Sequence, residues 1–334
     1  MATLDDVASL AGVSKATASR ALARPELVAP ATIAKVRTAA ETLGFEPSRI
    51  ARALARGRTG LVAMVVPNLE NSFFAPIIEG AQRQAELSGY HLTIAVRGLD
   101  SVADHLAMER LSHQVDGFLL TAPQADEVVL QKVSAMAPTV LIEREVTGIP
   151  SVIADSPTAF AKLATDFVEL GHTKIAYIGG PSGSWPNQMR GDAIAEAVRG
   201  RAELSVFGPY PPLAESGFDV AERVLAAGVT AAIVYAAPIS LGLMFALKAN
   251  TAGLPSGPAA SIVVSGDERM TRAMGVEGIP SIDVDGEAIG RSSMELLVAL
   301  LERKNLGAAS QVRIAVPVHW STADPATVPV ALVP

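Results

Sequence analysis

The sequence predicts a small all-α helix-turn-helix unit followed by a bilobed α/β core of two parallel-sheet, Rossmann-like lobes. Three observations lead to this prediction. Two short helical stretches flank Gly12 near the N-terminus, and from Leu61 onward apolar runs alternate with helical stretches in two successive series. The two parts also carry opposite net charges. The 334 residues are enough for a small unit and a larger body of one or two domains.

Residues 4–13 predict a first short helix that ends in a tight turn. Leu4, Val7 and Ala8 are spaced as one apolar stripe of that helix. Gly12 permits the backbone conformation that a sharp reversal requires. Val13 is placed to fill the angle between this helix and the next one.

The second helix begins after Ser14, whose hydroxyl is placed to cap it, and Ala18 and Leu22 face inward. Its outer face carries a cation, two hydroxyls and an arginine, from Lys15, Thr17, Ser19 and Arg20. These groups suit phosphate oxygens and the edges of DNA bases. An ordinary helical hairpin with a solvated polar face is the alternative, because helix-turn-helix patterns yield false positives.

Charge favours DNA as the partner of this unit. Residues 1–60 contain nine Lys and Arg against five Asp and Glu, whereas the other 274 residues contain 18 against 29. A basic head on an acidic body is expected when only the head meets a polyanion. Cysteine is absent, which excludes disulfides and thiolate chemistry. The acidic N-terminus and the lack of a long uncharged apolar run predict a cytoplasmic protein without a membrane span.

A third helix is predicted over residues 32–43, with Gly44 as its C-terminal stop. Residues 47–56 then predict a short basic helix that Ser48 can cap. A helix of this length is barely stable alone. Pairing with a second copy in the DNA minor groove would order it, with Leu54 as an apolar wedge. A frayed, charged linker is the alternative, and residues 56–60 are interpreted as the tether to the core.

Residues 3–56 resemble the headpiece and hinge helix of the LacI/GalR family of bacterial transcriptional repressors. The matching positions are Thr3, Leu4, Asp6, Val7, Ala8, Ala11, Gly12, Val13, Ser14, Thr17, Ser19, Arg20, Leu43, Gly44, Phe45, Pro47, Ala51, Arg52 and Leu54. Two positions depart from the common pattern, since Ala18 replaces a frequent Val and Ser48 replaces a frequent Asn.

The resemblance implies how this region meets a double-stranded DNA operator. It implies that Lys15, Ala16 and Arg20 read bases in the major groove and that Thr17 and Ser19 help to hold phosphates. It also implies that the hinge leucine opens the central step of a palindrome. The predicted DNA contacts are Thr3, Ser14, Lys15, Ala16, Thr17, Ser19, Arg20, Ser48, Ala51 and Leu54.

Two series of strands and helices are predicted in the core. The first series has strands at 61–67, 91–96, 117–121 and 139–143, with helices at 74–88, 102–114 and 126–137. The second has helices at 158–170, 190–199, 217–227 and 241–251, with strands at 174–180, 203–207, 231–235 and 261–265. A last long helix at 284–304 and a final strand at 311–318 follow. Apolar runs separated by helices are typical of parallel sheets covered on both faces.

Two similar halves predict two lobes with a ligand cleft between them. The resemblance extends here, because the family shares this core with periplasmic sugar-binding proteins. The predicted domains are a headpiece at 1–46, a hinge at 47–60, a core at 61–320 and a disordered tail at 321–334. Within the core, the N-lobe comprises about 61–156 plus 285–305, and the C-lobe about 157–284 plus 306–320.

Several residues that follow strands are candidates for contacting a small effector. By resemblance they match pocket positions of the family, with Arg190 as the principal anchor and Asp155 next. The predicted contacts are Ser72, Phe73, Phe74, Arg144, Asp155, Trp185, Arg190 and Asp267. Carboxylates and arginines that face one cleft suit neutral polyhydroxy ligands such as sugars, or nucleosides. The alternative is structural, with Phe74 in the core, Asp155 as a cap and Arg190 as a solvated helix charge.

The second lobe departs from the family pattern. Ala237 and Pro238 stand where members usually carry an Asn-Asp pair that grips the ligand, and Gly266 replaces a frequent aromatic residue. Residues 280–285 replace a usual Thr-Thr and Gln-Pro stretch. Either the effector is unusual for the family, or this pocket does not bind one tightly.

Catalytic motifs are missing, so we expect no enzyme, cofactor or metal site. Residues 179–183 follow a strand but lack the Lys-Ser/Thr of a phosphate-binding loop and the full dinucleotide fingerprint. Ser182 has no glycine two residues later, which excludes a nucleophile elbow. The five histidines show no metal-ligand spacing. Asp283 and Asp285 alone are too few for a cation loop.

These observations predict a homodimeric repressor of a pseudo-palindromic operator. No leucine heptads follow the core, so a tetramer-forming extension is not expected. A metabolite that changes the angle between the lobes would switch the hinge helices between ordered and frayed states. The alternative is a transport-type binding module in which the N-terminal helices are only structural.

Overall fold

The computed structural model describes residues 2–23, 27–45, 58–99, 101–251, 263–267, 279–303 and 310–320. The predicted hinge helix, with Ser48, Ala51 and Leu54, lies outside the described residues, and so does the predicted tail at 321–334. Among the described residues, no helix combines the length and the apolar character needed to cross a lipid bilayer.

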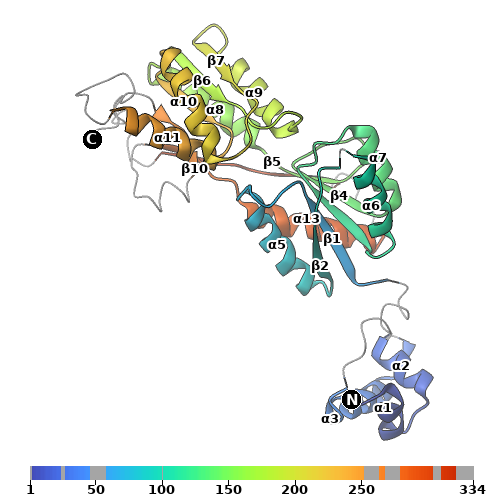
Figure 1. Cartoon of the computed structure of the whole chain (residues 1–334). Coiled ribbons are helices and arrows are strands. Elements are labelled where there is room, and N and C mark those ends of the chain that lie inside the picture. Colours follow the sequence, from blue (N-terminus) through green and yellow to red (C-terminus); the bar gives the residue numbers. More distant parts are fainter. Residues whose placement is uncertain are drawn as a thin grey trace.

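Three helices form the N-terminal unit, here called the headpiece (Figure 1). They are α1 (Leu4–Ala11), α2 (Lys15–Ala23) and α3 (Pro30–Thr42). The predicted reversal is present, because Gly12 adopts a left-handed conformation with φ of 65° at the end of α1. The small hydrophobic core consists of valines and alanines, namely Val7, Ala8, Ala18, Ala21, Val36, Ala39 and Ala40.

The N-lobe contains a six-stranded parallel sheet in the order β12-β5-β4-β3-β1-β2. Its strands are β1 (Leu61–Val66), β2 (His91–Val96), β3 (Gly117–Thr121), β4 (Thr139–Ile142), β5 (Ser151–Ala154) and β12 (Gln311–Ile314). Helices α5 (Phe74–Leu87) and α13 (Gly286–Leu301) cover one face, and α6 (Val102–Ser112) and α7 (Glu127–Met136) cover the other. Apolar side chains on both faces account for the continuous apolar strands in the sequence.

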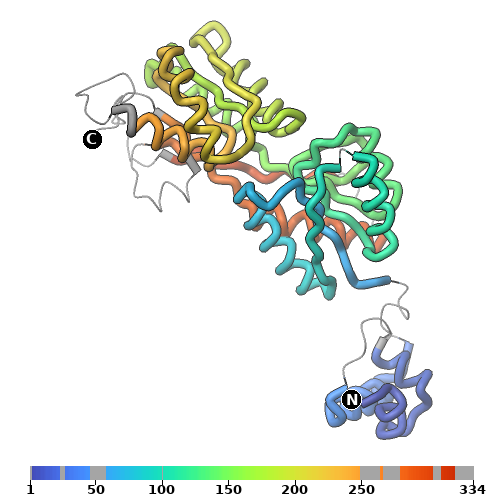
Figure 2. The backbone as a smooth tube through the Cα atoms, in the orientation of Figure 1, coloured from blue at the N-terminus to red at the C-terminus, as the bar shows by residue number. Residues whose placement is uncertain are grey.

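The C-lobe repeats this arrangement around a four-stranded parallel sheet in the order β7-β6-β8-β9 (Figure 2). Its strands are β6 (Lys174–Ile178), β7 (Glu203–Phe207), β8 (Ala231–Val234) and β9 (Val263–Val264). Helices α8 (Ser156–Glu169) and α9 (Trp185–Val198) pack on one face, and α10 (Ala214–Ala226) and α11 (Ala237–Thr251) pack on the other.

A small third sheet lies beside the connections between the lobes. It contains β10 (Gly266–Asp267), β11 (Pro280–Ile282) and β13 (Val318–Trp320), in that order. Among the described residues, the chain passes between the lobes at 154–156, 282–286 and 314–318, because each of these segments joins an element of one lobe to an element at the other. These connections hold the two parallel-sheet lobes next to each other, with a cleft between them.

Three sequence predictions about the core need correction. Strand β5 was not expected, and it lies between two predicted elements as a short run before α8. The predicted strand at 311–318 is two strands, because residues 315–317 separate β12 from β13. Strand β12 pairs with β5, so residues 311–314 belong to the N-lobe sheet and not to the C-lobe.

Candidate DNA-binding face and inter-lobe cavity

Helix α2 presents a polar face to solvent. Lys15, Ala16 and Arg20 are exposed, and Thr17 and Ser19 are partly exposed. The Lys15 ammonium lies 2.6 Å from the Asp5 carboxylate in a solvated ion pair, which is worth at most about 1 kcal/mol and yields readily to a phosphate. The face that the sequence predicted for DNA is therefore accessible.

Capping hydroxyls fix the start of both helices of the turn. The Ser14 hydroxyl accepts a hydrogen bond from the Thr17 backbone N–H at 3.1 Å, as the sequence predicted for an N-cap. Thr3 caps α1 in a reciprocal capping box with Asp6. The hydrogen bonds from the backbone and the hydroxyl of Thr3 lower the pKa of Asp6. These contacts give Ser14 and Thr3 structural roles, and their DNA contacts stay predictions.

The chain enters the N-lobe at residues 58–60, here called the collar, which are held by hydrogen bonds. Asp116 accepts the backbone N–H of Thr59 at 2.7 Å on one carboxylate oxygen and that of Gly60 at 2.8 Å on the other. Arg58 donates to the Tyr90 hydroxyl at 3.3 Å and to the carbonyl oxygen at the end of α13. The collar therefore ties the segment that leads from the headpiece to both β3 and α13.

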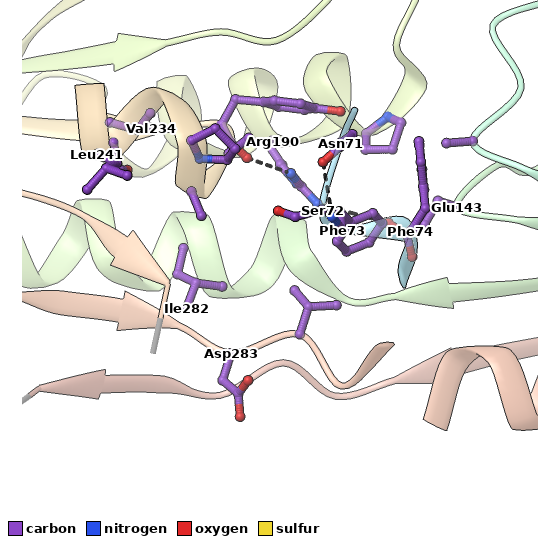
Figure 3. A pocket seen from close by; sticks show the side chains of 18 of the residues that line it. Asn71, Ser72, Phe73, Phe74, Glu143, Arg190, Val234, Leu241, Ile282 and Asp283 are labelled. Carbon is purple, nitrogen blue, oxygen red and sulfur yellow. Dashed lines mark hydrogen bonds and ion pairs between the residues drawn. The ribbon is translucent and has the colours of Figure 1, made fainter. Parts of the chain in front are cut away.

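A cavity of about 500 Å³ lies between the two lobes, within the size range of small-molecule sites. Figure 3 draws Arg190, Phe73 and Phe74 among the lining side chains, while the Asp283 carboxylate points away from them. The lining residues are Asn71, Ser72, Phe73, Phe74, Pro76, Ala122, Glu143, Phe160, Pro186, Arg190, Ala214, Val234, Tyr235, Ala236, Ala237, Pro238, Ser240, Leu241, Ile282, Asp283 and Val284.

Arg190 of α9 is a buried cation held on several sides. Its Nε donates to the Ser156 hydroxyl at 2.9 Å, and one Nη donates to the Tyr235 carbonyl at 3.2 Å. The rings of Phe160 and Tyr235 lie 4.8 Å and 5.1 Å from the guanidinium carbon. These contacts hold the guanidinium rigidly, and the rings stabilise its charge through cation–π interactions.

Glu143 follows β4 and lies beside Arg190 in the lining of the cavity. Its side chain is 1% exposed, and one carboxylate oxygen accepts the Ala154 backbone N–H at 2.6 Å. The other lies 4.0 Å from an Arg190 Nη atom. Burial raises the pKa of Glu143, and the Arg190 charge offsets only part of this effect. Glu143 has a φ of 58°, a conformation that non-glycine residues adopt rarely.

The cavity contains half of the sequence-predicted effector contacts. Ser72, Phe73, Phe74 and Arg190 line it. Phe74 is also buried in the N-lobe core and Arg190 is buried, so the alternative of a solvated Arg190 is wrong. Asp267 lies in β10, and its side chain is outside the described part of the chain.

Three other predicted contacts do not line the cavity. Asp155 stands at the N-cap position of α8, but its side chain accepts from the Thr158 hydroxyl at 2.9 Å and makes no capping bond to the backbone. Trp185 is the first residue of α9, one turn before Arg190. Arg144 follows Glu143, and it is Glu143 that lines the cavity. The positive φ at Glu143 accounts for this placement, because simple alternation along a strand does not apply there.

Comparison with known proteins identifies the family of both the headpiece and the core. Residues 3–48 match the model for bacterial regulatory proteins of the lacI family. Residues 59–319 match the model for periplasmic binding proteins and the sugar binding domain of the LacI family. The chain belongs to the lacI family. It is a DNA-binding transcriptional regulator of this family, and the alternative of a transport-type module is not favoured.

Individual relatives of this lacI-family regulator agree. The ribose operon repressor of Escherichia coli (strain K12) is 31% identical over 235 residues, which cover 67% of this chain and 71% of the relative. The HTH-type transcriptional repressor PurR of Vibrio atlanticus (strain LGP32) is 27% identical over 320 residues, which cover 91% and 93%. The Lac repressor dimer bound to operator and the anti-inducer ONPF superimposes with a TM-score of 0.79 at 25% identity, over 95% of this chain and 97% of that one.

Proposed function

We propose that this regulator represses transcription by binding a pseudo-palindromic operator as a homodimer, and that a small neutral ligand in the inter-lobe cavity controls it. The accessible cationic and hydroxyl-bearing face of α2 carries the proposal, since this arrangement suits the major groove. The predicted DNA contacts and effector contacts belong to this proposal. We expect a cytoplasmic protein without catalytic activity, as its regulatory relatives suggest.

Exposed apolar side chains support the homodimer. Each lobe has an edge strand with such side chains, Ile94 and Val96 on β2 and Val206 on β7. Phe218 and Phe245 are also exposed, on α10 and α11 of the C-lobe. Exposed apolar side chains that recur on an edge strand of each lobe suit a two-fold interface.

Operator binding tests the first half of the proposal. Fluorescence anisotropy with DNA from the upstream region of the gene should show binding by a dimer at low ionic strength. Arg20→Ala should weaken it by about 1–3 kcal/mol if Arg20 contacts a base, whereas Arg110→Ala, on exposed α6 of the core, should not. Equal affinities of the two variants would contradict the role of α2.

Ligand control tests the second half. Arg190→Ala should abolish the response of operator binding to any effective ligand while operator affinity without ligand stays within about threefold. A response that persists in this variant would remove Arg190 from the effector site. The headpiece is the internal control, because its α2 face is unchanged.

A further inference from the structure

The two walls of the inter-lobe cavity differ in polarity. The N-lobe wall contributes the polar side chains of Asn71, Ser72 and Glu143 beside the rings of Phe73 and Phe74. The C-lobe wall between β8 and α11 is formed mainly by small and apolar side chains, namely Val234, Ala236, Ala237, Pro238 and Leu241. A ligand here meets polar and aromatic groups on one side and a mainly apolar surface on the other.

The polar groups of the C-lobe wall already have partners inside the protein. The Tyr235 hydroxyl lies 3.0 Å from the Ser184 hydroxyl, and the Ser240 hydroxyl donates to the Ser265 carbonyl at 2.6 Å. A ligand hydroxyl placed against this wall would lose its bonds to water and gain few from the described residues. Such a loss opposes binding.

The opposite edge of the cavity offers one donor beside one acceptor. Two nitrogens of Arg190 donate to Ser156 and Tyr235, while the second Nη faces Glu143. Its distance of 4.0 Å from the Glu143 carboxylate oxygen is too long for a hydrogen bond. A ligand edge with an adjacent carbonyl and N–H matches both groups, since the carbonyl accepts from Arg190 and the N–H donates to Glu143.

We propose that the effector is a neutral molecule with a flat, largely apolar ring and a single lactam-like or amide-like edge directed at Glu143 and Arg190. This inference rests on the proposed function of the cavity as the effector site. The rings of Phe73 and Phe74, 5.9 Å apart, line the same space as the apolar C-lobe wall and suit an aromatic body. A polyol lacks partners on the apolar wall, and an anionic edge lacks the N–H that would donate to Glu143.

Three probes of similar size separate these classes by isothermal titration calorimetry on the full chain. Isoquinolin-1(2H)-one has the ring and the lactam edge, 1-naphthoate has a similar ring with an anionic edge, and ribose is polar all round. We expect the lactam to bind at least tenfold more tightly than either of the others. Tighter binding of ribose or of 1-naphthoate, or no binding of any probe, would overturn the assignment.

The group at Glu143 is tested by Glu143→Gln, which keeps an acceptor and adds an N–H donor. The ratio of lactam affinity to 1-naphthoate affinity should fall at least tenfold, because the anionic edge gains a donor at this position. Glu169→Gln, on the exposed end of α8, should leave the ratio unchanged. An unchanged ratio in folded Glu143→Gln would contradict the role of Glu143, and the probe ranking of the unmodified chain does not depend on how this variant folds.

Operator binding measured with the same probes separates this inference from the proposed function. If the lactam binds but leaves operator affinity unchanged, ligand control fails while the ligand class stands. If ribose binds and changes operator affinity through Arg190, the ligand class fails while the effector site stands.

Discussion

The headpiece and the core differ in the size of their hydrophobic cores and in how their proposed binding sites are assembled. The headpiece buries only two valines among five alanines, whereas the N-lobe alone buries residues as large as Phe118, Met108 and Leu130. Its proposed DNA-binding face lies on one helix, α2, whereas the cavity is lined by side chains from both lobes. A single substitution should therefore be able to unfold the small headpiece without unfolding the core. The larger core should keep its fold after most substitutions, except those at close contacts.

The largest effect is expected from a charge in the headpiece core. Val36→Asp places a carboxylate at a fully buried position of α3. An uncompensated buried charge costs several kcal/mol, so operator affinity should fall by about two orders of magnitude or more. Thr38→Asp, exposed on the same helix, adds equal charge and should cost far less. Loss of the core's thermal transition in Val36→Asp would show that the two units are not independent.

A close helix contact in the core gives the next effect. A Cβ atom at Gly290 of α13 would lie 2.0 Å from the Ile77 carbonyl oxygen of α5. Gly290→Ala should therefore reduce the free energy of unfolding by about 1–3 kcal/mol, measured by urea denaturation. Ser292→Ala, half-buried on the same helix, is the control. Operator binding should persist in both variants if the core stays folded under assay conditions. An unchanged free energy of unfolding in Gly290→Ala would refute this close contact between α13 and α5.

The collar that joins the two regions should give a smaller effect. Asp116→Ala removes the acceptor of the Thr59 and Gly60 backbone N–H groups. The linker then enters the N-lobe less rigidly, and we expect operator affinity to fall by about tenfold while probe binding in the cavity is unchanged. Asp126→Ala, exposed before α7, should leave both unchanged. If Asp116→Ala changed ligand affinity and left operator affinity unchanged, Asp116 would not act by holding the linker.

The smallest effect concerns pH and is confined to the C-lobe. Burial lowers the pKa of His172 below its ordinary value of 6.5. The unfolded chain therefore binds a proton at His172 more readily than the folded chain, and stability falls as pH drops through 6.5 towards the folded value. The stability difference between pH 7.5 and 5.5 should be smaller in His172→Asn than in the unmodified chain. An equal or larger difference would contradict this.

The same difference between local and distant contacts determines which structural features could be predicted from the sequence. The headpiece was predictable because local signals define it, such as the apolar stripe with Val7, the turn at Gly12 and the cap at Ser14. The alternation of apolar strands and helices likewise predicted two parallel sheets. Strand β5 was missed because its four residues follow an isolated bridge between Val146 and Ile149 instead of a helix.

The cavity was only partly predictable because distant segments assemble it. Phe73 was predicted because it follows the first strand of the core, and Arg190, which lies within α9, was assigned by resemblance to a family pocket position. Glu143 was missed in favour of Arg144, because the left-handed backbone at Glu143 changes which side chain enters the cavity. The aromatic partners of the guanidinium, Phe160 and Tyr235, come from different elements, and no local spacing joins them.

Operator recognition by a dimer can be measured by selecting binding sites from random-sequence DNA with the full chain. We expect enrichment of one pseudo-palindrome, bound by two subunits and lost in Arg20→Ala. No enrichment, or an asymmetric site bound by a single subunit, would contradict this expectation.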